Sequence, residues 1–138
     1  MSTIKKSLII SLVSTVIGAI QMAIFLPDGV SCLDGTSSLL DGILFFMPIQ
    51  LVTVFIIGLV NKKVTDYFIL AFLLIFWFFI NKYEFTSRHA CWSTFSDIEI
   101  LKTVLLKSLL TCTICLFPIY FLMTKLGLGK VEKNLNKD

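Results

Sequence analysis

The sequence predicts an all-α integral membrane protein, a bundle of four transmembrane helices with both termini in the cytoplasm. Hydrophobic residues make up 57% of the 138 residues and charged residues only 15%, whereas charged residues make up about 25% of soluble domains. The mean hydropathy is +0.91. The apolar residues gather into four long runs, and most lysines lie at the ends of these runs. The length predicts a single domain over residues 1–138.

Each apolar run is long enough for a helix that crosses the hydrocarbon core, which takes about 20 residues. The predicted spans are residues 7–26, 39–60, 65–83 and 108–124. They leave outer links at 27–38 and 84–107 and a cytoplasmic tail at 125–138. The bulky side chains of the third span predict that much of its surface faces lipid; they are Phe68, Phe72, Phe76, Trp77, Phe78 and Phe79.

The fourth helix is expected to begin above the membrane. Ser96 and Glu99 have the spacing of a capping box, in which the serine side chain accepts from the amide of the glutamate and the glutamate accepts from the amide of the serine. A start near Asp97 makes this helix longer than the ~30 Å hydrocarbon core. Its first turns therefore lie at or above the outer interface.

The distribution of basic residues predicts the orientation. Lys and Arg accumulate in cytoplasmic loops. With four spans, both termini and the link near residues 61–66 share one side, and this side carries eight of the twelve basic residues. The chain also has no Asn-x-Ser/Thr sequence and no eukaryotic targeting signal. We therefore expect a bacterial inner membrane, with both termini inside.

Two cysteines lie singly in the two outer links. Cys32 is in the first link and Cys91 in the second, and the outside of a bacterial inner membrane is oxidising. A disulfide between them is expected, provided that their α-carbons approach within about 7 Å. The alternative is two thiols that lie too far apart to join.

Cys112 and Cys115 form a Cys-x-x-Cys motif in the fourth span. Three residues apart on a helix, they share one face, and this spacing permits disulfide cycling. The motif and the helix number resemble the membrane thiol oxidoreductases of the vitamin K epoxide reductase class, and this resemblance implies a bound quinone. Those enzymes keep a second cysteine pair in one outer link, which this chain lacks. The alternative is that both cysteines are small packing residues.

Polar and small residues inside the spans predict helix packing. Ser7, Ser11, Thr15 and Gly18 give the first span a face on which a second helix backbone can approach closely. Gln21 and Gln50 are expected to hydrogen-bond to neighbouring helices. The cores of the predicted spans hold no ionisable residue, and Asp41 stands at the edge of the second span. Asp41 is expected at the outer interface, or alternatively in a cavity.

These features favour a small non-enzymatic protein that acts by contact with another membrane protein. Accessory subunits and immunity proteins against pore-forming toxins have this size and layout. Self-association is an alternative to contact with a different protein. The first alternative is a thiol–disulfide oxidoreductase that uses Cys112 and Cys115, and the second is an oligomeric small transporter or channel that depends on Asp41. No cofactor is expected outside the oxidoreductase alternative. Nucleic-acid binding is not expected, because no basic stripe is present. A metal site is not expected either, because His89 and Cys91 supply only two ligands.

The redox state of the cysteines separates these alternatives. In intact cells and spheroplasts, gel shifts with a heavy maleimide, with and without reductant, are expected to show Cys32 joined to Cys91 and Cys112 and Cys115 reduced. Single Cys→Ser variants assign each shift. A Cys112–Cys115 disulfide that responds to quinone depletion would instead establish an electron-transfer enzyme.

Overall fold

The fold is all-helical over the part of the chain that the structure, a computed structural model, describes. This part comprises residues 2–26, 30–32, 35–60, 64–88 and 94–127. Its helices are α1 (Thr3–Phe25), α2 (Leu39–Leu59), α3 (Thr65–Arg88), α4 (Asp97–Thr103), the π-helical segment η2 (Val104–Ser108) and α5 (Leu109–Leu126).

The segments α4, η2 and α5 follow one another without a break as one helix, so the described residues form four long helices. Each of the four is long and apolar enough to cross a membrane. This confirms the predicted all-α fold of four potential membrane spans.

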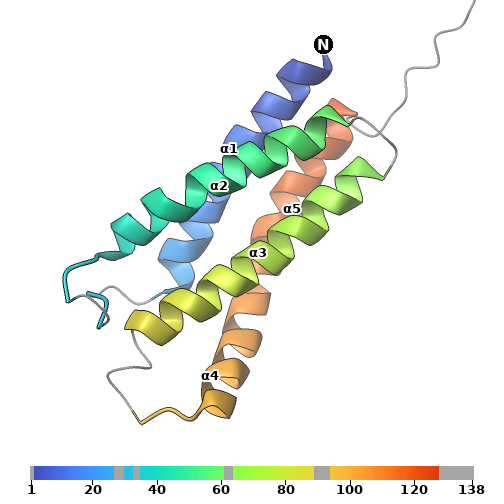
Figure 1. The fold of residues 1–138 in the computed structure, drawn as a ribbon. Coiled ribbons are helices and arrows are strands. Elements are labelled where there is room, and N and C mark those ends of the chain that lie inside the picture. Colours follow the sequence, from blue (N-terminus) through green and yellow to red (C-terminus); the bar gives the residue numbers. More distant parts are fainter. Residues whose placement is uncertain (1, 27–29, 33–34, 61–63, 89–93, 128–138) are drawn as a thin grey trace, which may run out of the picture.

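The four long helices alternate in direction around the bundle (Figure 1). α1 packs against α2 and α5, and α3 packs against the same two helices from the other side. The terminal end of the bundle holds the start of α1, the end of α2, the start of α3 and the end of α5. There the Lys6 ammonium donates to the carbonyl oxygen of Gly127 over 3.4 Å. The opposite end, where α2 and α4 begin, is called the link end below.

Two capping boxes fix the helix starts at the link end. Ser96 and Glu99 cap α4 reciprocally, which confirms the predicted start at Asp97. Ser38 and Asp41 cap α2 in the same way. This second box was not predicted, although serine followed three residues later by a carboxylate is a recognisable start signal. Both boxes satisfy amide groups that would otherwise lack partners at a helix start.

The small residues of α1 form its contact with α2. Ser7, Ser11, Ser14 and Gly18 are buried, and Thr15 is half-buried. The Ser7 hydroxyl donates to the carbonyl oxygen of Phe55 over 2.6 Å. It also faces Gly58, where a Cβ would collide with it. The backbones of α1 and α2 therefore approach closely near the terminal end, and small side chains are what permit this approach.

A buried polar group joins three helices in the middle of the bundle. The Trp77 indole N–H of α3 donates to Gln50 Oε1 of α2 over 2.7 Å, and Gln50 Nε2 donates to the Ser14 carbonyl oxygen of α1 over 2.7 Å. Gly18 leaves room for this Gln50 node, because a Cβ there would lie 2.8 Å from Gln50 Oε1. The arrangement corrects one expectation: Trp77 is fully buried rather than directed to lipid. Its ring fills the core while its one polar atom finds an acceptor.

Helix α3 is longer than the predicted third span. It continues to Arg88, so residues 84–88, which the sequence analysis placed in an outer link, are helical. The charges of Glu84 and Arg88 ended the apolar run in the sequence, but a charge does not by itself end a helix. The extra turn brings both side chains against the start of α2.

The Gln50 node predicts a specific loss of stability. Trp77→Phe removes the indole donor and leaves a buried amide oxygen unpaired, which costs about 1–3 kcal/mol. Unfolding of the purified protein in mixed micelles, followed by far-ultraviolet circular dichroism, measures this loss. The matched control is Phe79→Leu, since Phe79 is exposed on the same helix and its change is expected to have little effect. Equal stability of Trp77→Phe and the wild type would contradict the structural role of the node.

Candidate functional site

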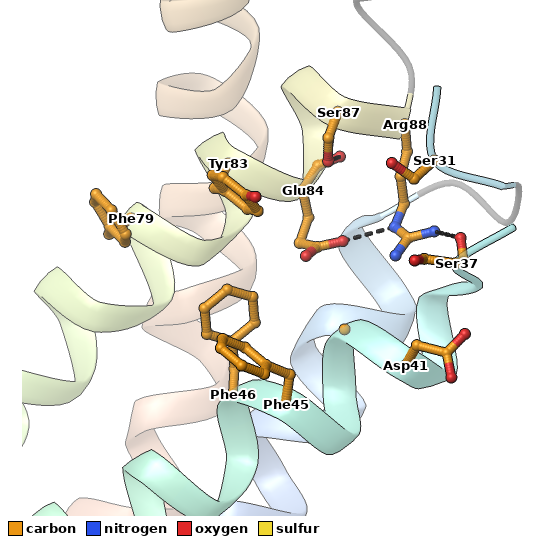
Figure 2. Close-up of a pocket in the computed structure, with 11 residues that line it drawn as sticks. Ser31, Ser37, Asp41, Phe45, Phe46, Phe79, Tyr83, Glu84, Ser87 and Arg88 are labelled. Carbon is orange, nitrogen blue, oxygen red and sulfur yellow. Dashed lines mark hydrogen bonds and ion pairs between the residues drawn. The ribbon is translucent and has the colours of Figure 1, made fainter. Parts of the chain in front are cut away.

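A cavity of about 630 Å³ opens between α2 and α3 at the link end of the bundle. We call it the α2–α3 cleft. Its lining combines serines, aromatic rings and three charged side chains; these residues are Ser31, Ser37, Asp41, Gly42, Phe45, Phe46, Phe79, Tyr83, Glu84, Ser87 and Arg88. Figure 2 shows the polar residues gathered toward the link end and the phenyl rings deeper along the two helices.

Aromatic rings form the deeper walls of the cleft. Phe45 and Phe46 come from α2, and Phe79 and Tyr83 come from one face of α3, four residues apart (Figure 2). Phe46 and Tyr83 meet edge to face, with ring centroids 6.1 Å apart. Phe45 is 67% exposed and Phe79 is 62% exposed. The cleft therefore opens sideways between the two helices.

An ion pair closes the cleft at the link end. Arg88 Nε donates to Glu84 Oε2 over 2.6 Å, within α3. The other two guanidinium nitrogens donate to the carbonyl oxygens of Ser37 and Ser38, over 2.7 Å each. Glu84 is only 4% exposed and Arg88 6%. The guanidinium therefore bonds the end of α3 to the residues that start α2, in the fixed fork geometry that favours Arg over Lys at such a position.

The Glu84 carboxylate has one oxygen that the ion pair does not use. Among the described residues, a hydrogen bond reaches this carboxylate only at Oε2. Figure 2 shows the carboxylate between the two helices, with its second oxygen on the side of Phe46, away from Arg88. Gly42 permits this position, since a Cβ there would lie 3.0 Å from Oε2 and 3.1 Å from Oε1. The second carboxylate oxygen of Glu84 thus faces the cleft.

Asp41 lies on the rim of the cleft, where its carboxylate caps α2. Asp41 Oδ2 accepts from the Ser38 amide over 2.7 Å and from the Ser38 hydroxyl over 2.8 Å. The residue is exposed. The structure therefore places Asp41 at the link end of α2, which is consistent with an interfacial position, while its side chain also contributes to the lining.

The central ion pair of this site was not predicted from the sequence. Glu84 and Arg88 stand four residues apart, the spacing at which opposite charges pair along a helix. That spacing was the available signal. The predicted third span ends at residue 83, before both charged residues. The sequence could not show that Ser37 and Ser38, about fifty residues earlier, supply acceptors for the same guanidinium.

Cys112 and Cys115 lie on α5, away from the lining of the cleft. Cys112 is fully buried, its Sγ 3.5 Å from Ser108 Oγ and 3.7 Å from Asn81 Nδ2. Cys115 is half-buried, and both are free thiols. No disulfide joins two of the described cysteines. The surroundings of Cys112 are those of a packing residue in a small polar cluster.

The other predicted residues are placed as follows. Cys32 is held near the end of α3: its amide donates to the Ser87 carbonyl oxygen over 3.0 Å, and its Sγ lies 2.8 Å from the same oxygen. Cys91 and His89 lie outside the described residues. Gln21 is fully buried, and its side-chain amide finds no hydrogen-bond partner among the described residues. Gln50, by contrast, joins two helices as expected.

The ion pair predicts an asymmetric mutational response. Arg88→Met leaves a buried carboxylate and two carbonyl groups without their donor, which is expected to destabilise the bundle by about 3–5 kcal/mol. The double variant Glu84→Gln/Arg88→Met removes both charges and is expected to regain part of this loss. Denaturation in mixed micelles measures both variants. Lys102→Met, at an exposed lysine of α4, is the matched control and should unfold like the wild type. A double variant less stable than Arg88→Met would contradict the pairing.

Comparisons of this chain with protein-family models, with curated proteins and with solved structures find no match. The geometry of the α2–α3 cleft is therefore the basis on which a function is proposed.

Proposed function

We propose that this chain is a multi-pass protein of a bacterial inner membrane, with both termini in the cytoplasm, that acts by contact with another membrane protein and performs no catalysis. The observation that supports this proposal is the α2–α3 cleft. It opens sideways between α2 and α3 and exposes the rings of Phe45 and Phe79 there. A partner that lies in the same bilayer reaches such an opening directly.

The use of the buried polar groups also favours a binding role. Gln50 and Trp77 bond to each other and to Ser14, and Arg88 bonds to Glu84 and to two carbonyl oxygens. These contacts join helices and match the role of polar residues in membrane bundles. Aromatic residues, in turn, dominate the centres of protein interfaces. The partner is either a larger complex, to which this chain is an accessory subunit, or a pore-forming toxin, against which it gives immunity.

The two other functions receive less support from the described residues. A thiol oxidoreductase needs an accessible thiolate, and Cys112 is fully buried. A transporter or channel that depends on Asp41 needs this carboxylate inside a pathway, and Asp41 instead caps its own helix.

We also propose that Cys32 and Cys91 form a disulfide in the outer links. The support is the position of Cys32, whose amide bonds to the carbonyl oxygen of Ser87. Only three residues separate Ser87 from Cys91 in the sequence. This bridge would join the link before α2 covalently to the link after α3.

Photo-crosslinking in living cells tests the contact role. A benzophenone amino acid in place of Tyr83, at the cleft, is expected to give one discrete protein adduct, identified by mass spectrometry. The matched control is the same substitution at Tyr120 on α5, a tyrosine of similar exposure that does not line the cleft. Identical adducts from both positions, or lipid adducts alone from Tyr83, would overturn the proposal. A toxin as the identified partner would further predict that the chain protects sensitive cells.

A further inference from the structure

We propose that the α2–α3 cleft binds a monovalent organic cation, an ammonium or guanidinium group carried on an apolar body. The positive charge would lie against Glu84 Oε1, and the apolar body would lie among the aromatic rings. The inference rests on the proposed function only for the position of the cleft in the membrane. It adds the chemical class of the group that the cleft accepts.

The charges that line the cleft favour a cation. They comprise two carboxylates, Asp41 and Glu84, and one guanidinium, Arg88. The three guanidinium nitrogens of Arg88 each donate a short hydrogen bond to an oxygen of the bundle, at 2.6–2.7 Å. Arg88 is thus oriented by protein acceptors, and an anion would meet an excess of negative charge. A cation reduces this excess.

The state of the Glu84 carboxylate points in the same direction. The side chain is 5% exposed, and among the described residues only Oε2 accepts a hydrogen bond. A largely buried negative charge is stabilised by an opposite charge beside it. The oxygen lies beside a cavity rather than inside packed side chains (Figure 2). A cation in the cleft would lie against this oxygen and offset the remaining negative charge.

The aromatic walls add a second attraction for the same charge. Phe46 and Tyr83 line the cleft near Glu84, and Phe79 lines it further along α3 (Figure 2). The face of an aromatic ring carries partial negative charge and attracts ammonium and guanidinium groups, most strongly where water is excluded. A neutral apolar ligand would gain the contact with the rings but not this electrostatic attraction. The Glu84 carboxylate and the aromatic rings together therefore favour a ligand that is both positively charged and apolar in its body.

A positive group of this chemical class has two sources in a membrane. It is either a lysine or arginine side chain of the partner protein or the head group of a free amphiphile, such as an aminolipid. Both sources present a positive group at interfacial depth next to apolar material. The competition experiment below distinguishes them.

Binding of a defined probe tests the inference. The probe is benzyltrimethylammonium, titrated into the full chain in nanodiscs, with empty nanodiscs as background. The comparison compound is neopentylbenzene, which has the same shape and no charge. We expect saturable binding of the cation and no saturable binding of the neutral compound. Equal binding of the two compounds, or no saturable binding of either, overturns the proposal.

Variants locate the site of binding. Phe46→Leu leaves the ion pair intact and is expected to weaken binding about fivefold. Glu84→Gln is expected to weaken binding roughly tenfold or more. The matched control is Phe117→Leu on α5, where the ring is 72% exposed and outside the cleft; its affinity should equal that of the wild type. Wild-type affinity in folded Phe46→Leu overturns the proposal even if Glu84→Gln does not fold.

The photo-crosslink at Tyr83 separates this inference from the proposed function. A protein adduct that benzyltrimethylammonium suppresses identifies the cation as a side chain of the partner. Saturable probe binding without any protein adduct supports the inference with a free amphiphile as the source, and contradicts the proposed function. A protein adduct without probe binding supports the proposed function and overturns the inference.

Discussion

The hydrogen bonds and ion pair of the Arg88 guanidinium determine the structure of the link end. This one side chain bonds to Glu84 on its own helix and to the carbonyl oxygens of Ser37 and Ser38 before α2. A buried guanidinium is tolerated only with such partners. The pair therefore requires that α3 continue past its apolar run and that the end of α3 lie against the start of α2. This contact closes one end of the α2–α3 cleft, which lies between the two helices.

The same physical rule operates at the centre of the bundle. In a bilayer, helices would gain little from apolar contact with one another, so close packing and buried polar bonds would decide how they associate. The Gln50 node joins α1, α2 and α3 through Trp77 and Ser14, and Gly18 provides the space for it. The fourth helix has its own polar contact, from Asn81 to Ser108. Polar groups thus connect each helix to its neighbours at different levels.

At the α2–α3 cleft, this pairing of polar groups is incomplete. One carboxylate oxygen of Glu84 faces a cavity rather than a donor, and aromatic rings surround the remaining walls. Elsewhere, Gln21 and the side-chain oxygen of Asn81 are also buried without a partner among the described residues, but neither belongs to the lining of the cleft. The combination of charge, rings and lateral opening is what makes this cleft the candidate site.

The sequence alone determined the number of apolar helices and the start of α4, because hydropathy and the Ser96–Glu99 box are local properties. It also indicated the packing face of α1, through the spacing of Ser7, Ser11 and Gly18. Only the tertiary structure decided that Trp77 is buried and that α3 reaches Arg88. These outcomes depend on acceptors far away in the sequence, Gln50 for the indole and Ser37 and Ser38 for the guanidinium. A side chain that looks lipid-facing or solvent-facing by its local pattern is buried when a distant segment satisfies its polar atoms.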